Sequence, residues 1–150
     1  MKTFLIVLLI LPLLTSCASG PSKGQLDDEV KRLCAIDGGI KVYETVRLPA
    51  KNFETKGWGS SEISIPNKKY VKPTSKYYYE SSTIHLIKGS PSLSKYHYKI
   101  YRQSDNKLLG ETISYARIGG DMPGPWHHSS FMCPENSDLA RRIFIKHDGE

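Results

Sequence analysis

The sequence lacks the short motifs that mark several common enzyme classes. It contains no Gly-x-Ser-x-Gly, no His-Glu-x-x-His and no phosphate-binding loop. Neither Cys-x-x-Cys nor His-x-x-x-His spacing occurs, which argues against a zinc site. The motifs therefore give no support to serine hydrolases, zinc proteases or nucleotide-binding enzymes, and we predict no metal and no cofactor.

Runs of like charge are also missing. The net charge is +6, but the lysines and arginines are scattered and no run reaches five residues. We therefore predict no nucleic-acid partner and interpret the basic residues as a solvated surface. A weak preference for anionic partners, such as lipid headgroups or cell-wall polymer, is the alternative.

The sequence has no apolar run long enough for a transmembrane helix. The apolar stretch Phe4 to Leu14, after Lys2, rises about 1.5 Å per residue as a helix and cannot cross a hydrocarbon core of about 30 Å. Its length is typical of a cleaved export signal. We predict a signal peptide over residues 1–16.

The residues Leu14-Thr15-Ser16-Cys17 resemble the lipobox of bacterial lipoproteins. The resemblance implies that the Cys17 thiol carries a diacylglycerol (with palmitate-type acyl chains), that the leader is cut before it, and that the protein is anchored in a membrane. Ala18 follows in place of the Asp that favours the inner membrane, which implies an outer-membrane location on the periplasmic face. The alternative is an ordinary signal peptide with a coincidental cysteine. Residues 17–24 are then the lipidated cysteine with a small, polar tether, and 25–150 form a single domain.

Two cysteines remain, Cys34 and Cys133. Two cysteines in an exported chain favour one disulfide, which would close a loop of about a hundred residues and contribute roughly 4–5 kcal/mol in chain-entropy models. Two separate thiols are the alternative.

Periodicity predicts the α+β class, with an N-terminal helix packed on an antiparallel sheet of four to six strands. The helix is expected over 22–36, where apolar residues recur at helical spacing before Asp37-Gly38-Gly39. Patterns of β-branched and aromatic residues predict the strands, at 40–46, 77–87, 94–103 and 108–118, with shorter ones at 62–65 and 141–146 and a helical turn at 137–140.

The segment 119–134 holds three Pro and three Gly and is predicted to be irregular. We predict binding contacts by Trp126, His127 and His128. A purely structural reading has Cys133 pinning the loop, Trp126 and Phe131 filling a core edge, and the histidines in solvent. A metal site would need Asp121, His85 or His97 to complete it, because adjacent residues of an extended chain point to opposite sides.

Tyrosines recur on the predicted strands, at 77–79, 96, 98 and 101. They are interpreted as sheet packing, with an aromatic binding surface as the alternative.

The leader, the Cys-Ala-Ile-Asp-Gly-Gly run at 34–39 and the Pro-Gly-Pro-Trp-His run at 123–127 resemble small uncharacterised lipoproteins of Gram-negative bacteria, from which no activity carries over. The leading hypothesis is an envelope lipoprotein with a non-enzymatic binding or structural role. Its partner would be an envelope protein or cell-wall polymer. Alternatives are a small metal-dependent or hydrolytic enzyme using His127 and His128, and an exclusion or lysis-related lipoprotein of a mobile element.

Overall fold

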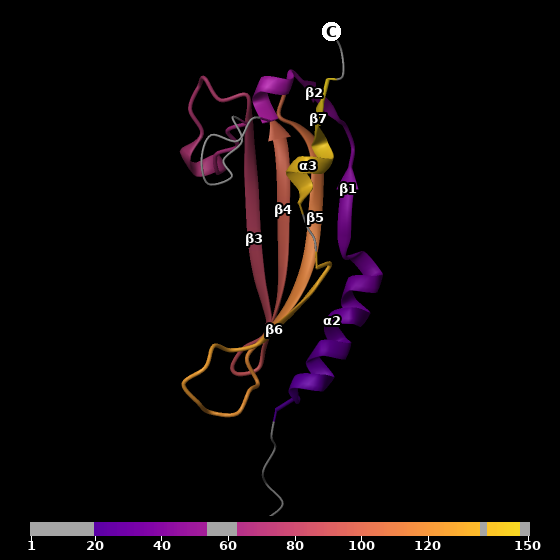
Figure 1. Cartoon of the computed structure of the whole chain (residues 1–150), viewed down its shortest axis with the longest axis vertical. Coiled ribbons are helices and arrows are strands. Elements are labelled where there is room, and N and C mark those ends of the chain that lie inside the picture. The colour runs from indigo at the N-terminus through magenta and orange to yellow at the C-terminus, as the bar shows by residue number, and fades with distance from the viewer. Residues whose placement is uncertain (1–19, 54–62, 136–137, 148–150) are drawn as a thin grey trace, which may run out of the picture.

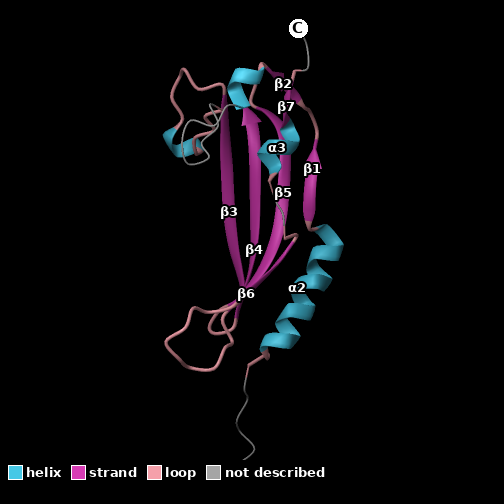
Figure 2. Ribbon diagram, viewed as in Figure 1, coloured by secondary structure: helices cyan, strands magenta, loops and turns pink. Residues whose placement is uncertain are grey.

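The computed structural model describes residues 20–53, 63–135 and 138–147, and its fold is α+β as predicted (Figure 1). A long N-terminal helix lies beside an elongated sheet, and short C-terminal elements lie at the other end of the same sheet (Figure 2). In chain order the elements are α2 (Lys23–Asp37), β1 (Gly39–Val42), β2 (Val46–Leu48), the 3-10 helices η2 (Ala50–Phe53) and η3 (Lys68–Tyr70), β3 (Tyr77–Ile87), β4 (Ser92–Arg102), β5 (Lys107–Ile118), β6 (Ser130–Cys133), α3 (Leu139–Ile143) and β7 (Phe144–Lys146).

Helix α2 forms where the sequence predicts it, and its N-terminus is well specified. The Ser22 side chain accepts a hydrogen bond from the Gln25 amide while the Gln25 side chain accepts one from the Ser22 amide, which is a capping box. Leu26 and Val30 are the buried residues of the helix. Lys23 and Gly24, which the sequence assigns to the tether, lie in its first turn.

The sheet is built around β5. Its partner β4 pairs antiparallel with it on one edge, and β3 pairs antiparallel with β4. The other edge of β5 pairs with two short strands in succession, β1 opposite residues 110–113 and β6 opposite residues 115–118. The strands predicted over 94–103 and 108–118 form as β4 and β5, which pair as a hairpin, and Asn106 takes a positive φ of 53° at its turn.

Two hydrophobic clusters lie on opposite faces of this sheet. The helix cluster consists of Leu26, Val30, Leu93 and Tyr115, and it packs α2 against β5 and β6. The C-terminal cluster consists of Ile100, Leu109, Leu139, Ile143 and Phe144. Side chains alternate between faces along each strand, so Leu93 and Ile100 of β4 point to opposite sides. Each cluster therefore covers one face toward one end of the sheet.

The expected single strand over 40–46 is wrong, because it divides between two sheets. β1 ends at Val42, where the amides of Tyr43 and Glu44 both donate to the Leu109 carbonyl. The chain then leaves the main sheet, and β2 pairs in parallel with β7.

Three further expectations need correction. No strand forms over 63–65, and residue 62 lies outside the described part of the chain. The segment 119–134 is not wholly irregular, because residues 130–133 form β6 on the free edge of β5. At the C-terminus the helix is longer and the strand shorter than predicted, with α3 reaching Ile143.

Candidate functional site

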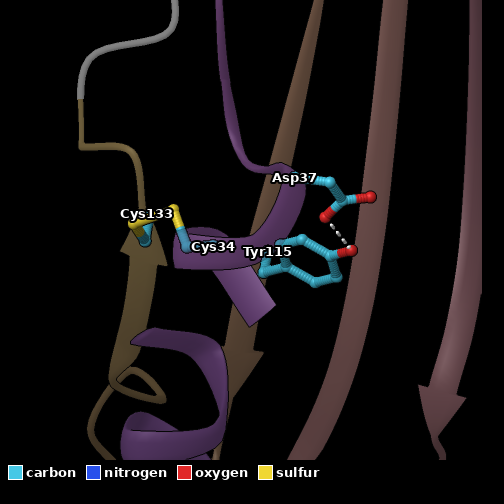
Figure 3. The surroundings of a disulfide bond; sticks show 4 residues. All are labelled: Cys34, Asp37, Tyr115 and Cys133. Atoms are coloured by element: carbon cyan, nitrogen blue, oxygen red, sulfur yellow. Dashed lines mark hydrogen bonds between the residues drawn. A yellow bond between two sulfur atoms is a disulfide. The ribbon is translucent and has the colours of Figure 1, made fainter. Parts of the chain in front are cut away.

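The predicted disulfide between Cys34 and Cys133 is present, with the two Cα atoms 6.0 Å apart (Figure 3). It joins the last turn of α2 to the last residue of β6. Beside it the Tyr115 hydroxyl donates to Asp37 at 2.7 Å, and the Lys95 ammonium contacts the other carboxylate oxygen at 2.5 Å. The hydrogen bond from Lys95, and next that from Tyr115, lower the pKa of Asp37. The disulfide therefore sits in a packed junction between helix and sheet.

The loop 119–129 begins at the end of β5, beside a buried arginine. Arg117 is 2% exposed, and its guanidinium donates to the Asp27 carboxylate at 2.7 Å. The same guanidinium donates to the carbonyl oxygens of Gly119 and Ser129 at 2.9 and 2.8 Å. One side chain thus holds both ends of the loop and links them to α2.

A second set of contacts closes the loop from the other side. The Asp121 carboxylate accepts hydrogen bonds from the Ser129 amide at 2.6 Å and from the Ser129 hydroxyl at 2.7 Å. It also accepts one from the Lys23 ammonium at 2.7 Å, in the first turn of α2. The Lys23 bond, followed by the bonds from Ser129, lowers the pKa of Asp121 well below its usual range. The loop and the start of the helix are therefore neighbours in space.

The turn between β3 and β4 supports the same loop. The Gly120 amide donates to the Ser90 hydroxyl at 3.2 Å, and a Cβ added at Gly120 would lie 2.9 Å from the Pro91 side chain. Gly120 has a φ of +82°, which L residues with side chains rarely adopt. Glycine is required here by both the backbone angle and the close contact.

Between these anchors the tip of the loop projects into solvent at the end of the molecule where α2 begins (Figure 1). Trp126 is 60% exposed and Met122 is 80% exposed, while His127 and His128 are also exposed. The Trp126 indole lies over the backbone of Gly124, where an added Cβ would come within 2.2 Å of the ring. The structure therefore brings the three predicted binding residues together on one exposed tip.

The expectation that Trp126 fills a core edge is wrong, since most of its surface is open. Phe131 does fill a core edge, because it packs against the helix cluster. The two aromatic residues differ because Phe131 belongs to β6, which α2 covers, whereas Trp126 lies beyond the end of the sheet.

The residues that a metal site would need are not gathered around the loop. His85 contacts the Ser94 hydroxyl on one face of the sheet, and His97 contacts Glu111 on the other. Asp121 is held by Lys23 and Ser129. Within 20–53, 63–135 and 138–147, no group of three or more His, Cys, Asp or Glu residues is placed to hold a metal ion.

The strand tyrosines pack within the sheet. Tyr78 stacks on Tyr101 with ring centroids 5.1 Å apart, and Tyr79 lies against Tyr98 at 4.8 Å. All six tyrosines at 77–79, 96, 98 and 101 are buried or half-buried. Burial raises the pKa of Tyr98 to about 12. They therefore do not form an open aromatic binding surface.

Sequence reasoning missed the two residues that hold the loop, Arg117 and Asp27. The signal was present, because Arg117 occupies an inward position of an alternating strand. A buried arginine needs a carboxylate or several carbonyl partners. Asp27 of α2 supplies the carboxylate.

Cys17, the predicted lipidation site, lies outside the described residues. Among the helices that the structure does describe, none has the length and apolarity needed to cross a membrane. Comparison of the chain with protein-family models, with curated proteins and with solved structures finds no match.

Proposed function

We propose that this protein is a lipid-anchored envelope lipoprotein with a non-enzymatic binding or structural role, held in the outer membrane on the periplasmic side through Cys17. The lipobox resemblance of residues 14–17 supports the anchor. The disulfide of the mature domain supports the compartment, because disulfides persist in oxidising spaces such as the periplasm.

The observation that carries the proposal is the lipobox resemblance of residues 14–17. The contact between Lys23 and Asp121 adds the position of the loop. It places the loop with Trp126 beside the start of α2, only a few residues after the proposed anchor. The exposed surface of the loop therefore lies at the anchored end of the domain. A binding role for this loop is then a role close to the membrane.

Three carboxylates of the domain are held in hydrogen bonds within the fold, which favours binding over catalysis for these groups. Asp121 holds the loop closed, and Asp37 joins helix to sheet. Glu111 accepts hydrogen bonds from the Tyr43 hydroxyl at 2.5 Å and from His97 at 2.6 Å. Tyr43 and next His97 lower the pKa of Glu111, which favours a permanently charged carboxylate over a proton-transfer group.

The test is the chemical state and location of residue 17. The full chain is expressed in a Gram-negative host, and membranes are separated from soluble extract and analysed by mass spectrometry. We expect a mature protein that begins at an acylated Cys17 and leaves the membrane in detergent but not in high salt. Cys17→Ser should move the protein to the soluble fraction or leave the leader uncut. An intact Met1 together with an unmodified Cys17 thiol would overturn the proposal.

A further inference from the structure

We infer that the tip of the loop, residues 122–128, lies in the headgroup region of the membrane that holds the anchor, so that the lipid surface itself is its partner. This inference rests on the proposed function, because it requires acylated Cys17. It adds a second membrane contact, made by the folded domain, to the covalent one.

Chain length sets the distance of the loop from the bilayer. Cys17 precedes Gly20, the first described residue, by three peptide links, and three residues span at most about 10 Å when extended. Gly20 is in turn three residues from Lys23, whose ammonium is 2.7 Å from Asp121. The loop therefore starts within a short reach of the acyl chains, at the end of the domain that faces them.

The composition of the tip fits a lipid interface. Met122-Pro123-Gly124-Pro125-Trp126 carries no charged side chain, and the nearest carboxylate, Asp121, is turned into the ion pair with Lys23. Trp is the side chain most enriched at headgroup depth, where an apolar ring and a polar N–H are both accommodated. His127 and His128 follow on the same tip and are also exposed.

The loop is also built to hold this surface in place. Arg117 grips both of its ends, Asp121 closes it onto Ser129, and Gly120 rests on Pro91. The indole of Trp126 is oriented by its contact with Gly124. An exposed aromatic side chain on a fixed loop loses little conformational freedom when it binds, which favours a binding surface.

The sequence has two tryptophans, so the Trp58→Phe variant leaves Trp126 as the sole reporter. This full-length variant is produced as the acylated protein and reconstituted into vesicles of phosphatidylethanolamine and phosphatidylglycerol. Some vesicles contain phospholipid brominated near the glycerol end of its acyl chains. We expect the emission of Trp126 to be blue-shifted and to be quenched by brominated lipid. Acrylamide dissolved in the water should quench it less than it quenches Trp126 in the unfolded protein without detergent.

A matched control places the reporter at the other end of the domain. Tyr70 is 69% exposed in η3, beside the end of β3 that lies away from the loop. In the variant with Trp58→Phe, Trp126→Phe and Tyr70→Trp, the emission should be quenched by acrylamide and not by brominated lipid. Equal lipid quenching at both positions would overturn the inference, since it would show that the domain lies flat or is inserted without a preferred end.

The outcomes separate the two proposals. If the acylated protein floats with the vesicles but Trp126 is quenched only from the water, the loop does not contact lipid and the inference is wrong while the anchor stands. If the protein is not acylated and does not float, the proposed function fails and the inference fails with it. Gly124→Ala gives a second check, because it displaces the indole without removing it and should reduce lipid quenching at unchanged flotation.

Discussion

The two ends of the domain are stabilised in different ways. At the loop end, α2, β6 and the loop are joined by the disulfide, by the buried Arg117–Asp27 pair and by the Lys23–Asp121 pair. At the far end, α3, β2 and β7 are held by the apolar C-terminal cluster around Ile100 and Ile143. The disulfide and the ion pair of the buried Arg117 are therefore both at the end that carries the exposed loop. The far end combines apolar packing with the more exposed ion pairs that Glu44 makes with Arg102 and Lys107.

Strands β3, β4 and β5 contribute residues to both hydrophobic clusters. β4 supplies Leu93 to the helix cluster and Ile100 to the C-terminal cluster, on opposite faces of the sheet. The central strands therefore couple the two clusters, and the stability of either end depends on the sheet that both share.

The largest effect is expected from removing the disulfide, which belongs to the loop end. Replacing both Cys34 and Cys133 by Ser should lower the free energy of unfolding by about 4 kcal/mol, because the bond spans 99 residues of sequence and restricts the unfolded chain. Denaturation in urea, followed without reducing agent, measures the change. Cys17→Ser is the control, and a double variant with the parent's midpoint would contradict the prediction.

The next effect compares the two clusters directly. Ile143→Ala at the far end and Leu26→Ala at the loop end each remove a side chain no more than 2% exposed, and each should cost about 3 kcal/mol. Trp126 and a Trp introduced at Tyr70 report the two ends separately.

Because β4 and β5 carry both clusters, we expect the transitions at the two reporters to coincide in each variant. Two separate midpoints in Ile143→Ala would show instead that the ends unfold independently, as two units and not one.

The sequence predicts the elements that depend on local patterns. The helix over 22–36, with its apolar residues at helical spacing, and the strands over 94–103 and 108–118 are each encoded by residues close in sequence, and all are confirmed. The disulfide follows from counting the cysteines, given the prediction that the chain is exported. These features require no knowledge of which elements lie next to each other.

The errors occur where tertiary contacts override the local pattern. The run 40–46 reads as one strand, but β1 and β2 separate where the Leu109 carbonyl accepts two successive amides. The residues of β6 follow a Gly- and Pro-rich loop, and they become a strand because the edge of β5 beyond β1 is free. Of the candidate site, the exposed tip is identified from sequence, whereas the contacts of Arg117 that fix it are not.

Acid should weaken the loop end by a smaller amount. The hydrogen bond from Lys23, with those from Ser129, lowers the pKa of Asp121 in the folded protein. The stabilisation that ionised Asp121 contributes is therefore fully present above its ordinary pKa, near pH 4. It is lost as the pH falls through the lowered pKa of the folded state. Asp121→Asn should therefore lose less stability than the parent between pH 5 and pH 2. Urea denaturation at several pH values gives the comparison, with Asp28→Asn on the exposed side of α2 as the matched control.

Lysine contacts also lower the pKa of Asp37 and Glu80, so the Asp121→Asn variant will still lose some stability in acid. The informative quantity is the difference between the curves of Asp121→Asn and Asp28→Asn. Superimposed curves would mean that the Asp121 contacts do not contribute to folding, and that the loop end is less firmly held than its hydrogen bonds indicate.

The smallest effect on stability separates the two aromatic residues of the loop segment. Trp126 is 60% exposed, so Trp126→Ala should change the free energy of unfolding by less than about 0.5 kcal/mol. Phe131 packs against the helix cluster under α2, so Phe131→Ala should cost more than about 1 kcal/mol. Thermal and urea denaturation of the two variants give both values. A large loss in Trp126→Ala would mean that the indole is needed for folding, whereas a negligible loss leaves this large apolar side chain without a structural role and strengthens the case that it serves a contact outside the domain.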